Sequence, residues 1–598
     1  EMCIRDSMKI VNTIKTILLL SVVVILPSCL DLDPQDQMSD ANLWQTPNDY
    51  KLYANQFYEW TRDFSSAVYD GPHSDTRSDL MTSSSYNEYS KGINNIPVSD
   101  GNYTGAYTKI RYANILLQKA ESYPNPTDIA RYVAEAKFFR AYEYFDLLQL
   151  FGDVIVVTEP IDITDPKMNA PRDDRSKVVD LIIEDLKQAI PDLPKENAIA
   201  TADKGRVSQG AAQAFLSRVA LYEGTWQKFR TGDVTRINDL LDIAAESAWE
   251  VIDSKQYEIF KPAELGTDAY KYLFILEDVQ SNPANIKKDK NKEYIFSRRH
   301  DEVIAPIGKN ITKNCFANVQ WVTRKLAEMY LGADGLPIDN AQSTAGVDYS
   351  TPDNEYAKRD NRMTNTLMAP GRKYWNNNAS HTTWTDADKA AFDNKDFYPT
   401  SGSGYNNQKW ATERNVKDEY EGYDFPIIRY AEVLLNYAEA VFERNADAEG
   451  NIMDASKVDA ALVYLNEVRQ RVNPNMPGLT TSFATTHNLK MREEIRRERT
   501  VELFNEGFRI DDLKRWKTAE TEMPENMLGV KWNTSGDWAT WAGKWSPSYS
   551  LEDGCLLIET NRVWSNKNYL YPLPSDQRQL NPNICLLYTS PSPRDYAA

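Results

Sequence analysis

The chain has few cysteines and histidines for its 598 residues. Its five cysteines lack the spacing of a zinc or iron-sulfur site. The four histidines lie far apart, with no pair four residues apart, so neither a metal nor a cofactor is expected. A phosphate loop and a nucleophile elbow are also missing. Because the two carboxylates of a glycosidase can come from anywhere in a sequence, these absences weaken an enzymatic function without excluding it.

The apolar segment near the N-terminus is too short to cross a bilayer as a helix. Ile17 to Leu26 (ILLLSVVVIL) has ten residues, whereas a membrane-spanning helix takes roughly 20. Lys9 and Lys15 precede this run and small residues follow it, which is the order of parts in a secretory signal. The sequence therefore predicts a signal peptide over residues 8–28, starting at Met8.

A cysteine stands directly after this segment. The tetrapeptide LPSC, which ends at Cys29, resembles a lipobox, the site at which bacterial lipoproteins are cleaved before a cysteine that then carries a diacylglycerol. Cys29 is therefore the expected lipidation site and the first residue of the mature chain. An ordinary secretory signal with an incidental cysteine is the alternative. The acids Asp31, Asp33 and Asp36 that follow are, by themselves, typical of a solvated tether.

Both ends of the chain are predicted to be non-native. Residues 1–7 and 585–598 fit neither a signal peptide nor a periodic pattern, and they are typical of read-through. Residues 29–584 are expected to form a single body. With Cys29 as the anchor, Cys315 and Cys555 remain within it, either as a disulfide or as two unpaired thiols.

Basic charge is scarce. The 87 Asp and Glu residues outnumber the 68 Lys and Arg residues, which gives a formal net charge of -19. Because a nucleic-acid-binding protein needs a basic face, no nucleic acid is expected as a partner. Aromatic residues, in contrast, include 14 Trp and 34 Tyr, so some rings are expected to serve as contact surfaces as well as core.

Apolar residues recur three to four residues apart over several segments, which predicts helices. The expected helices cover residues 103–122, 128–151, 176–190, 208–221, 237–254, 323–330, 428–443, 457–472 and 489–516. Gly152 suits the left-handed turn that ends a helix. Small residues such as Gly210 and Ala214 let a neighbouring helix approach closely, and such helix pairs are typical of a tetratricopeptide-like array.

Loop-rich insertions separate the expected repeats. The repeats occupy about residues 103–254 and 427–517, and the insertions about 60–102, 255–426 and 525–571. Loops of such length are usually functional or disordered, and their ring content argues against disorder. The last insertion contains five tryptophans, at positions 532, 538, 541, 545 and 564.

Longer motifs run in a fixed order through the mature chain. They are AEAKFFRAYEYFDLLQLFGDVIVV from Ala134, GRVSQGAAQAFLSRVALYEG from Gly205, TRKLAEMYLGADGLPI from Thr323, YAKRDNRMTNTLMAPG from Tyr356, IIRYAEVLLNYAEA from Ile427, IRRERTVELFNEGFRIDDLKRW from Ile495 and YLYPLPSDQRQLNPN from Tyr569. Together with LPSC, these motifs and their order resemble the SusD/RagB family of outer-membrane lipoproteins of the Bacteroidetes.

This resemblance implies a mainly α-helical fold of about four tetratricopeptide-like helix pairs, with the insertions packed on one side. It implies a lipoprotein anchored in the outer membrane and facing the cell exterior, in which the acids after Cys29 act as an export signal. It further implies glycan capture without cleavage, and a SusC-like TonB-dependent transporter as the partner. In such proteins the repeats commonly contact the transporter and the insertions hold the ligand.

The charged helix expected at residues 489–516 is interpreted as structural rather than catalytic. Its acids and bases lie three or four residues apart, where side chains meet on a helix and stabilise it by a few tenths of a kcal/mol each. The expected pairs are Arg499 with Glu502, Glu506 with Arg509, and Asp511 with Arg515.

Aromatic residues of the insertions are the predicted ligand contacts. A pyranose packs its C–H face on a flat ring, while Asn, Asp and Arg side chains bind its hydroxyl groups. The predicted binding residues are, in order, Trp321, Trp384, Trp375 and Tyr86, with Tyr374, Trp410, Arg77 and Asp79 beside them.

The leading hypothesis is a non-enzymatic glycan-binding subunit that delivers oligosaccharide to a transporter barrel. A repeat scaffold that binds peptide or protein and a surface glycoside hydrolase are the alternatives. Exposed ring platforms would favour glycan binding, an apolar helix groove would favour the scaffold, and a carboxylate pair across a cleft would favour the hydrolase.

Overall fold

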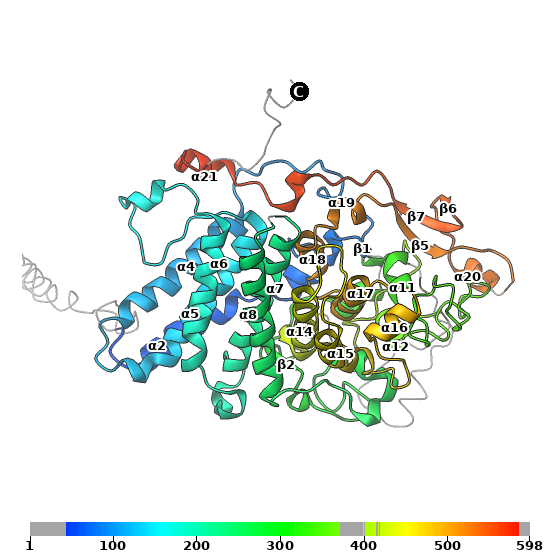
Figure 1. Cartoon of the computed structure of the whole chain (residues 1–598), viewed down its shortest axis with the longest axis horizontal. Helices are drawn as coiled ribbons and strands as arrows, with labels where there is room; N and C mark the ends of the chain where they lie inside the picture. Colours follow the sequence, from blue (N-terminus) through cyan, green and yellow to red (C-terminus); the bar gives the residue numbers. More distant parts are fainter. Residues whose placement is uncertain are drawn as a thin grey trace, which may run out of the picture.

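The structure, a computed structural model, describes residues 43–584 except residues 231, 317–318, 371–398, 400, 414–416, 418 and 537; of Phe316 it describes only the backbone. The predicted signal peptide, Cys29 and residues 1–7 and 585–598 therefore lie outside the described residues. The described chain is mainly helical, as predicted (Figure 1). None of its helices is both long and apolar enough to cross a membrane.

Five helices of the first half pack one after another. α4 (Gly101–Ala120), α5 (Pro126–Phe151), α6 (Arg175–Ala189), α7 (Gln209–Lys228) and α8 (Val234–Asp253) each contact the next along the chain. The array then continues after the middle insertion, because α14 (Tyr430–Arg444) packs against α7 and α8 and is followed by α15 (Ala455–Arg469) and α17 (Met491–Leu503). The tetratricopeptide-like architecture agrees with the sequence prediction, and so do the positions of these helices, except that α17 ends earlier than predicted.

The other elements are short. The remaining α-helices are α2 (Pro47–Ala54), α3 (Phe64–Ala67), α9 (Ala269–Leu273), α10 (Ile311–Phe316), α11 (Arg324–Met329), α12 (Asn361–Thr366), α16 (Thr481–Thr486), α18 (Arg509–Arg515), α19 (Ala519–Glu522), α20 (Trp538–Lys544) and α21 (Ser575–Leu580). The strands are β1 (Met81–Thr82), β2 (Tyr294–Arg298), β3 (Trp321–Val322), β4 (Phe425–Arg429), β5 (Met527–Lys531), β6 (Leu551–Glu552) and β7 (Cys555–Glu559). All pairings are antiparallel: β1 with β3, β2 with β4, and β7 between β5 and β6.

Helix α5 shows how local chemistry sets an element. Pro126 occupies its first turn, where the missing N–H costs nothing. The helix ends at Gly152, whose φ of 72° is accessible to glycine at little cost. A β-carbon there would also lie 2.8 Å from the Leu570 side chain. Gly152 is therefore confirmed as the end of this helix.

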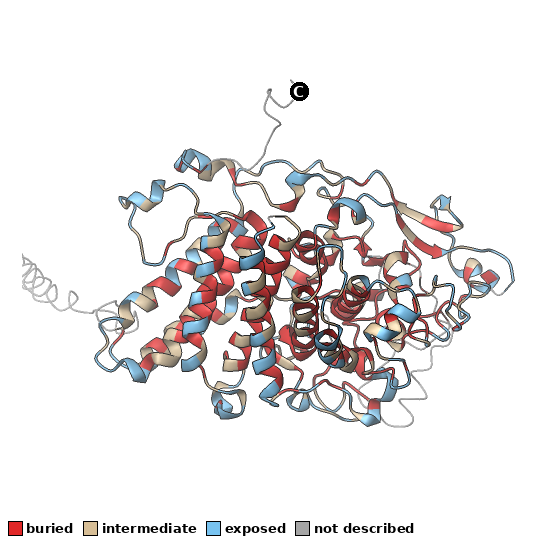
Figure 2. Ribbon diagram, in the orientation of Figure 1, coloured by how far each residue is buried: buried red, intermediate tan, exposed pale blue. Residues whose placement is uncertain are grey.

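The core lies where the long helices face one another, and α5 and α7 are buried over much of their length (Figure 2). The ring of Phe215 on α7 has its centroid 5.4 to 5.5 Å from those of Phe138, Tyr142 and Phe145 on α5. At Gly210, a β-carbon would lie 2.5 Å from the Tyr257 hydroxyl oxygen. Small residues on α7 thus permit close packing, as predicted.

The charged segment predicted as one helix at 489–516 is broken. Helix α17 ends at Leu503, α18 begins at Arg509, and the turn between them holds Asn505 and Gly507 at φ of 58° and 82°. The carboxylate of buried Asp75, from the early insertion, accepts hydrogen bonds from the backbone N–H groups of Asn505 (2.6 Å) and Arg509 (3.3 Å). A tertiary contact therefore stabilises the turn that interrupts the helix.

The ionic partners of this segment also differ from the prediction. Arg499 pairs with Asp512 (2.8 Å), and Arg509 pairs with Asp79 (2.7 Å), so the expected local pairs of both are replaced. Asp511 lies 2.6 Å from His73 rather than beside Arg515. The pairs are structural, as interpreted, and those of Arg509 and Asp511 join segments far apart in the sequence, because these side chains are buried against the early insertion.

Arg429, the last residue of β4, lies at the centre of a fully buried group of charges. It contacts Glu293 (2.9 Å), Glu502 (2.7 Å) and Glu506 (2.7 Å), and all four side chains are at most 1% exposed. Lys409 from the middle insertion also reaches Glu506 at 2.6 Å. This group ties the insertion, the β2–β4 pair and the end of α17 together.

The two remaining cysteines do not pair. Cys315 and Cys555 are both buried and both are free thiols. Of the two possibilities that the sequence leaves open, the structure has the unpaired thiols.

A buried carboxyl on α5 predicts a pH dependence of stability. Burial raises the pKa of Glu143 to about 8, against the opposing effect of Lys109, whose ammonium lies 3.1 Å away. Because this pKa lies above the ordinary value, the contribution of Glu143 to stability is complete at low pH and is lost as pH rises through about 8. Between about pH 5 and pH 8.5, the free energy of unfolding of the wild-type chain should fall by on the order of 3 kcal/mol more than that of the variant Glu143→Gln.

Urea unfolding of both proteins across this pH range measures the difference. Glu246→Gln, on an exposed position of α8, is the matched control and should follow the wild type. If the free energy of unfolding depends on pH in the same way in the wild type and in Glu143→Gln, then Glu143 is not the source of the pH dependence.

Candidate functional site

The structure places only some of the predicted binding residues. Tyr374, Trp375 and Trp384 lie outside the described residues. Of the remaining five, Tyr86 has 62% of its surface exposed and is free to meet a ligand, while Trp321 is only 3% exposed. The others are described in turn.

Trp410 belongs to the core, which corrects the expectation for this ring. It is fully buried, and its indole N–H donates to the backbone oxygen of Asn505 at 3.0 Å. Phe64 and Phe274 contact the ring edge to face, at centroid distances of 5.1 and 4.9 Å. No face of Trp410 is available to a sugar, because other rings already cover it.

Arg77 and Asp79 are engaged within the protein. Arg77 pairs with Asp70 (2.8 Å) and donates to the Tyr571 hydroxyl (2.7 Å). Asp79 is buried and accepts two hydrogen bonds from Arg509, at 2.9 and 2.7 Å. Burial by itself would raise the pKa of Asp79, but the Arg509 guanidinium outweighs it and holds that pKa well below the usual range. Asp79 is thus a structural acid, which is a second correction.

The last insertion forms a group of rings that we call the ring cluster: Trp532, Trp538, Trp541, Trp545 and Tyr549. Trp538 and Trp541 are 1% exposed and stack at 5.5 Å and 9°, which makes them the base of the cluster. Trp532 and Trp545 remain partly exposed and meet edge to face at 5.2 Å and 82°. Two nearly perpendicular ring planes therefore meet at the surface; the helix that carries the base of the cluster, α20, is labelled in Figure 1.

Hydrogen bonds and close packing hold the ring cluster in place. The indole N–H of Trp541 donates to the Pro399 oxygen (2.9 Å), and that of Trp538 to the Ser350 oxygen (3.2 Å). At Gly402, a β-carbon would lie 2.4 Å from the ring of Trp321, which in turn contacts Tyr549 edge to face at 5.8 Å. Trp321, the first of the predicted binding residues, is thus a buried ring that packs against the ring cluster.

Charged and polar side chains lie on the segments next to the ring cluster. The Arg324 guanidinium lies 4.6 Å from the centroid of Tyr349, next to Ser350, and Arg324 pairs with exposed Glu328 at 2.8 Å. Asn533 and Thr534 are exposed directly after Trp532. Partly exposed rings with amide, hydroxyl and charged groups beside them can pack against a sugar face and bind its hydroxyl groups.

Trp532, Trp545 and Tyr549 are not among the binding residues predicted from the sequence. The density of tryptophan in the last insertion was the signal that could have found the first two. Within the described ranges, no group of three or more His, Cys, Asp or Glu residues could hold a metal ion.

Comparison with known proteins covers most of the chain. Residues 278–585 match the family model described as "SusD family", and residues 30–221 match a model described as "Starch-binding associating with outer membrane". A curated SusD-like protein of Bacteroides ovatus is 26% identical over 176 residues, which cover 29% of this chain and 30% of that protein. The alignments span 30 to 45% of the length of the curated relatives that the chain matches.

Two solved structures from Bacteroides fragilis share the fold. One is a SusD-like protein that is 22% identical, with a TM-score of 0.68 over 93% of this chain and 100% of that chain. The other is described as a SusD-like carbohydrate binding protein; it is 21% identical, with a TM-score of 0.67 over 91% of this chain and 99% of that chain.

Proposed function

Because the chain belongs to the SusD family, we propose that it is a cell-surface glycan-binding protein, which captures oligosaccharide or polysaccharide and delivers it to a SusC-like TonB-dependent transporter. The observation that carries this proposal is the ring cluster, with Trp532 and Trp545 partly exposed at the surface. A structural relative described as carbohydrate-binding supports the same ligand class.

The geometry suits capture without cleavage. Buried Trp538 and Trp541 fix the orientation of the two outer rings, so a sugar that packs on Trp545 meets the edge of Trp532 without either ring having to be ordered first. Rigid rings lose little conformational entropy on binding. Glu502 and Glu506, in the charged α17–α18 region, are held in buried ion pairs rather than across an open cleft.

The proposal includes the predicted organisation of the chain. Residues 8–28 form the signal peptide, Cys29 carries the lipid anchor, and residues 29–584 are the body that faces the cell exterior. One acyl chain gives marginal membrane attachment and two or more give stable attachment, so a fully acylated Cys29 holds the protein at the outer membrane.

Native gels cast with a panel of polysaccharides test the proposal on the soluble chain from Asp31 to Asn583, and the same mixtures are assayed for new reducing ends. We expect retardation in at least one gel without new reducing ends. If no gel retards the chain, a scaffold that binds peptide becomes the favoured function. Released reducing ends would identify an enzyme instead.

A further inference from the structure

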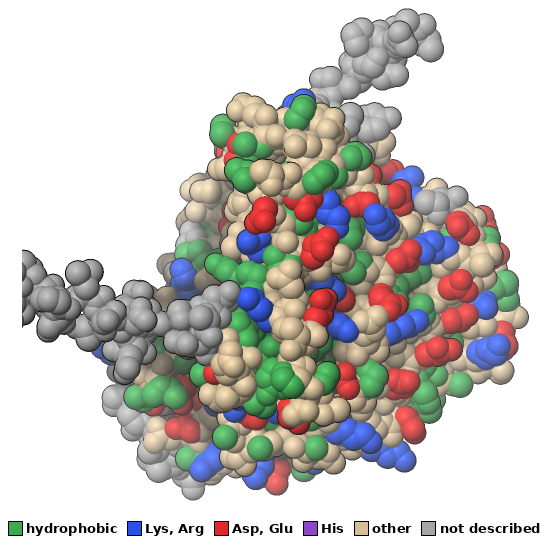
Figure 3. Space-filling view, turned by 90° about the vertical axis from the view of Figure 1, so that its left-hand side faces the viewer, with side chains coloured by type: hydrophobic (Ala, Val, Ile, Leu, Met, Phe, Trp, Pro, Cys, Tyr) green, Lys and Arg blue, Asp and Glu red, His purple; other side chains and the backbone are tan. Residues whose placement is uncertain are grey.

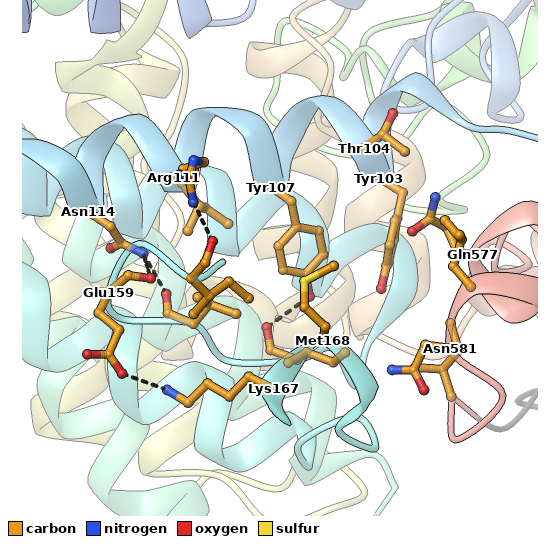
Figure 4. A pocket seen from close by; sticks show the side chains of 16 residues that line it. Tyr103, Thr104, Tyr107, Arg111, Asn114, Glu159, Lys167, Met168, Gln577 and Asn581 are labelled. Atoms are coloured by element: carbon orange, nitrogen blue, oxygen red, sulfur yellow. Dashed lines mark hydrogen bonds and ion pairs between the residues drawn. The ribbon is translucent and has the colours of Figure 1, made fainter. Parts of the chain in front are cut away.

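A separate cavity of about 330 Å³ lies on the first repeat, between α4, the segment 155–168 and α21 (Figure 4). Its lining on α4 runs from Tyr103 to Asn114, which is about 16 Å along the helix axis at 1.5 Å per residue. Patches of hydrophobic side chains are visible on this side of the molecule (Figure 3). The cavity is thus elongated, and it is built from parts of the chain that the ring cluster does not use.

The polar side chains along this cavity are already used within the protein. The Tyr107 hydroxyl donates to the Ile155 oxygen (2.8 Å), and Asn114 donates to the Val157 oxygen (3.0 Å). Asn581 donates to the Ala170 oxygen at 2.8 Å. Among the described residues that line the cavity, none has a buried polar side-chain atom without a partner.

The cavity therefore offers mainly apolar surface to a ligand. Its walls include the Tyr103 ring and the side chains of Ile110, Val157, Met168 and Leu580. A sugar placed here would give up hydrogen bonds to water without replacing them, which is unfavourable. An apolar ligand has no hydrogen bonds to water to lose. The cavity therefore suits an apolar ligand, whereas the ring cluster suits a sugar.

The mouth of the cavity carries charge. Arg111, Glu159 and Lys167 lie toward one end (Figure 4), and Lys167 pairs with Glu159 at 3.7 Å. Arg111 donates to the Ile161 oxygen at 2.6 Å and forms no ion pair with another described residue. The Arg111 side chain therefore offers an unpaired guanidinium at this end. It suits a ligand with an apolar tail and an anionic head.

We propose that this cavity binds one fatty acyl chain, with the tail between α4 and α21 and an anionic head group near Arg111. The same chemistry occurs in a free fatty acid and in a lipid of a bilayer. The proposal does not depend on glycan binding, because the ring cluster and the cavity share no residues.

Fluorescence titration of the soluble chain with a dansylated undecanoic acid tests the proposal. We expect saturable binding of one probe per chain, and at least about tenfold weaker binding in the double variant Met168→Glu, Leu580→Glu. Both positions are exposed, at 43% and 73%, so these charges should not prevent folding. Met453→Glu is the matched control, because Met453 is 68% exposed on another part of the chain, and it should bind like the wild type.

Three further measurements separate the possible sources of the acyl chain and test the role of Arg111. Displacement of the probe by free dodecanoate supports a fatty acid, and co-flotation with phosphatidylglycerol vesicles that the double variant loses supports a bilayer lipid. An Arg111→Gln variant should bind the acid more weakly and its methyl ester as before. The proposal is wrong if the probe does not saturate, if the double variant binds it unchanged, or if only an apolar peptide displaces it.

Discussion

Replacing Arg429 with alanine is expected to lower the free energy of unfolding by about 3–5 kcal/mol, since three buried carboxylates would lose their shared counter-charge. Glu293, Glu502 and Glu506 all contact this guanidinium within 2.9 Å. Burial by itself would raise the pKa of Glu502, but three surrounding guanidinium groups lower it to about 2. Without Arg429, each of these acids keeps one or two other cationic partners, among them Arg471 and Lys409, but loses the cation that all three share, and this costs stability.

Urea unfolding followed by circular dichroism measures this loss. Arg444→Ala is the matched control, because Arg444 also pairs with an acid, Asp242, at 2.9 Å, but its side chain is 39% exposed. An exposed pair contributes up to about 1 kcal/mol, so this variant should unfold close to the wild type. Equal losses in the two variants would contradict the argument from burial.

The second large effect is expected at the ring cluster. Changing both Trp532 and Trp545 to alanine should weaken glycan binding by about tenfold or more, because it removes the partly exposed rings and leaves the buried base of Trp538 and Trp541 in place. Native gels with the polysaccharide that retards the wild type most strongly measure the loss.

Trp249→Ala supplies the control for this experiment. Trp249 is 40% exposed on α8, where it packs against Tyr437 and Tyr464, far from the last insertion in the fold. Its removal should leave retardation unchanged. If the double variant binds as well as the wild type while remaining folded, the glycan site lies elsewhere, and Tyr86 is the next residue to change.

Much of the helical architecture follows from local chemistry. The apolar spacing of α4 and α5, the proline at the start of α5 and the glycine at its end act within one or two turns, so a single sequence is enough to place them. The same holds for the small residues of α7, whose packing role depends only on their size. Composition alone is also the basis for expecting no nucleic acid as a partner.

The candidate site depended on contacts between distant segments. Trp410 and Trp545 both stand in aromatic insertions, and their sequence surroundings do not show that one is enclosed by Phe64 and Phe274 while the other reaches the surface. Arg509 could have paired with Glu506 on a continuous helix. It pairs instead with Asp79, because the backbone bonds from Asp75 stabilise a turn before it. Helix periodicity is a property of neighbouring residues, whereas burial and ionic partners belong to the packed chain, so only the folded structure could assign them.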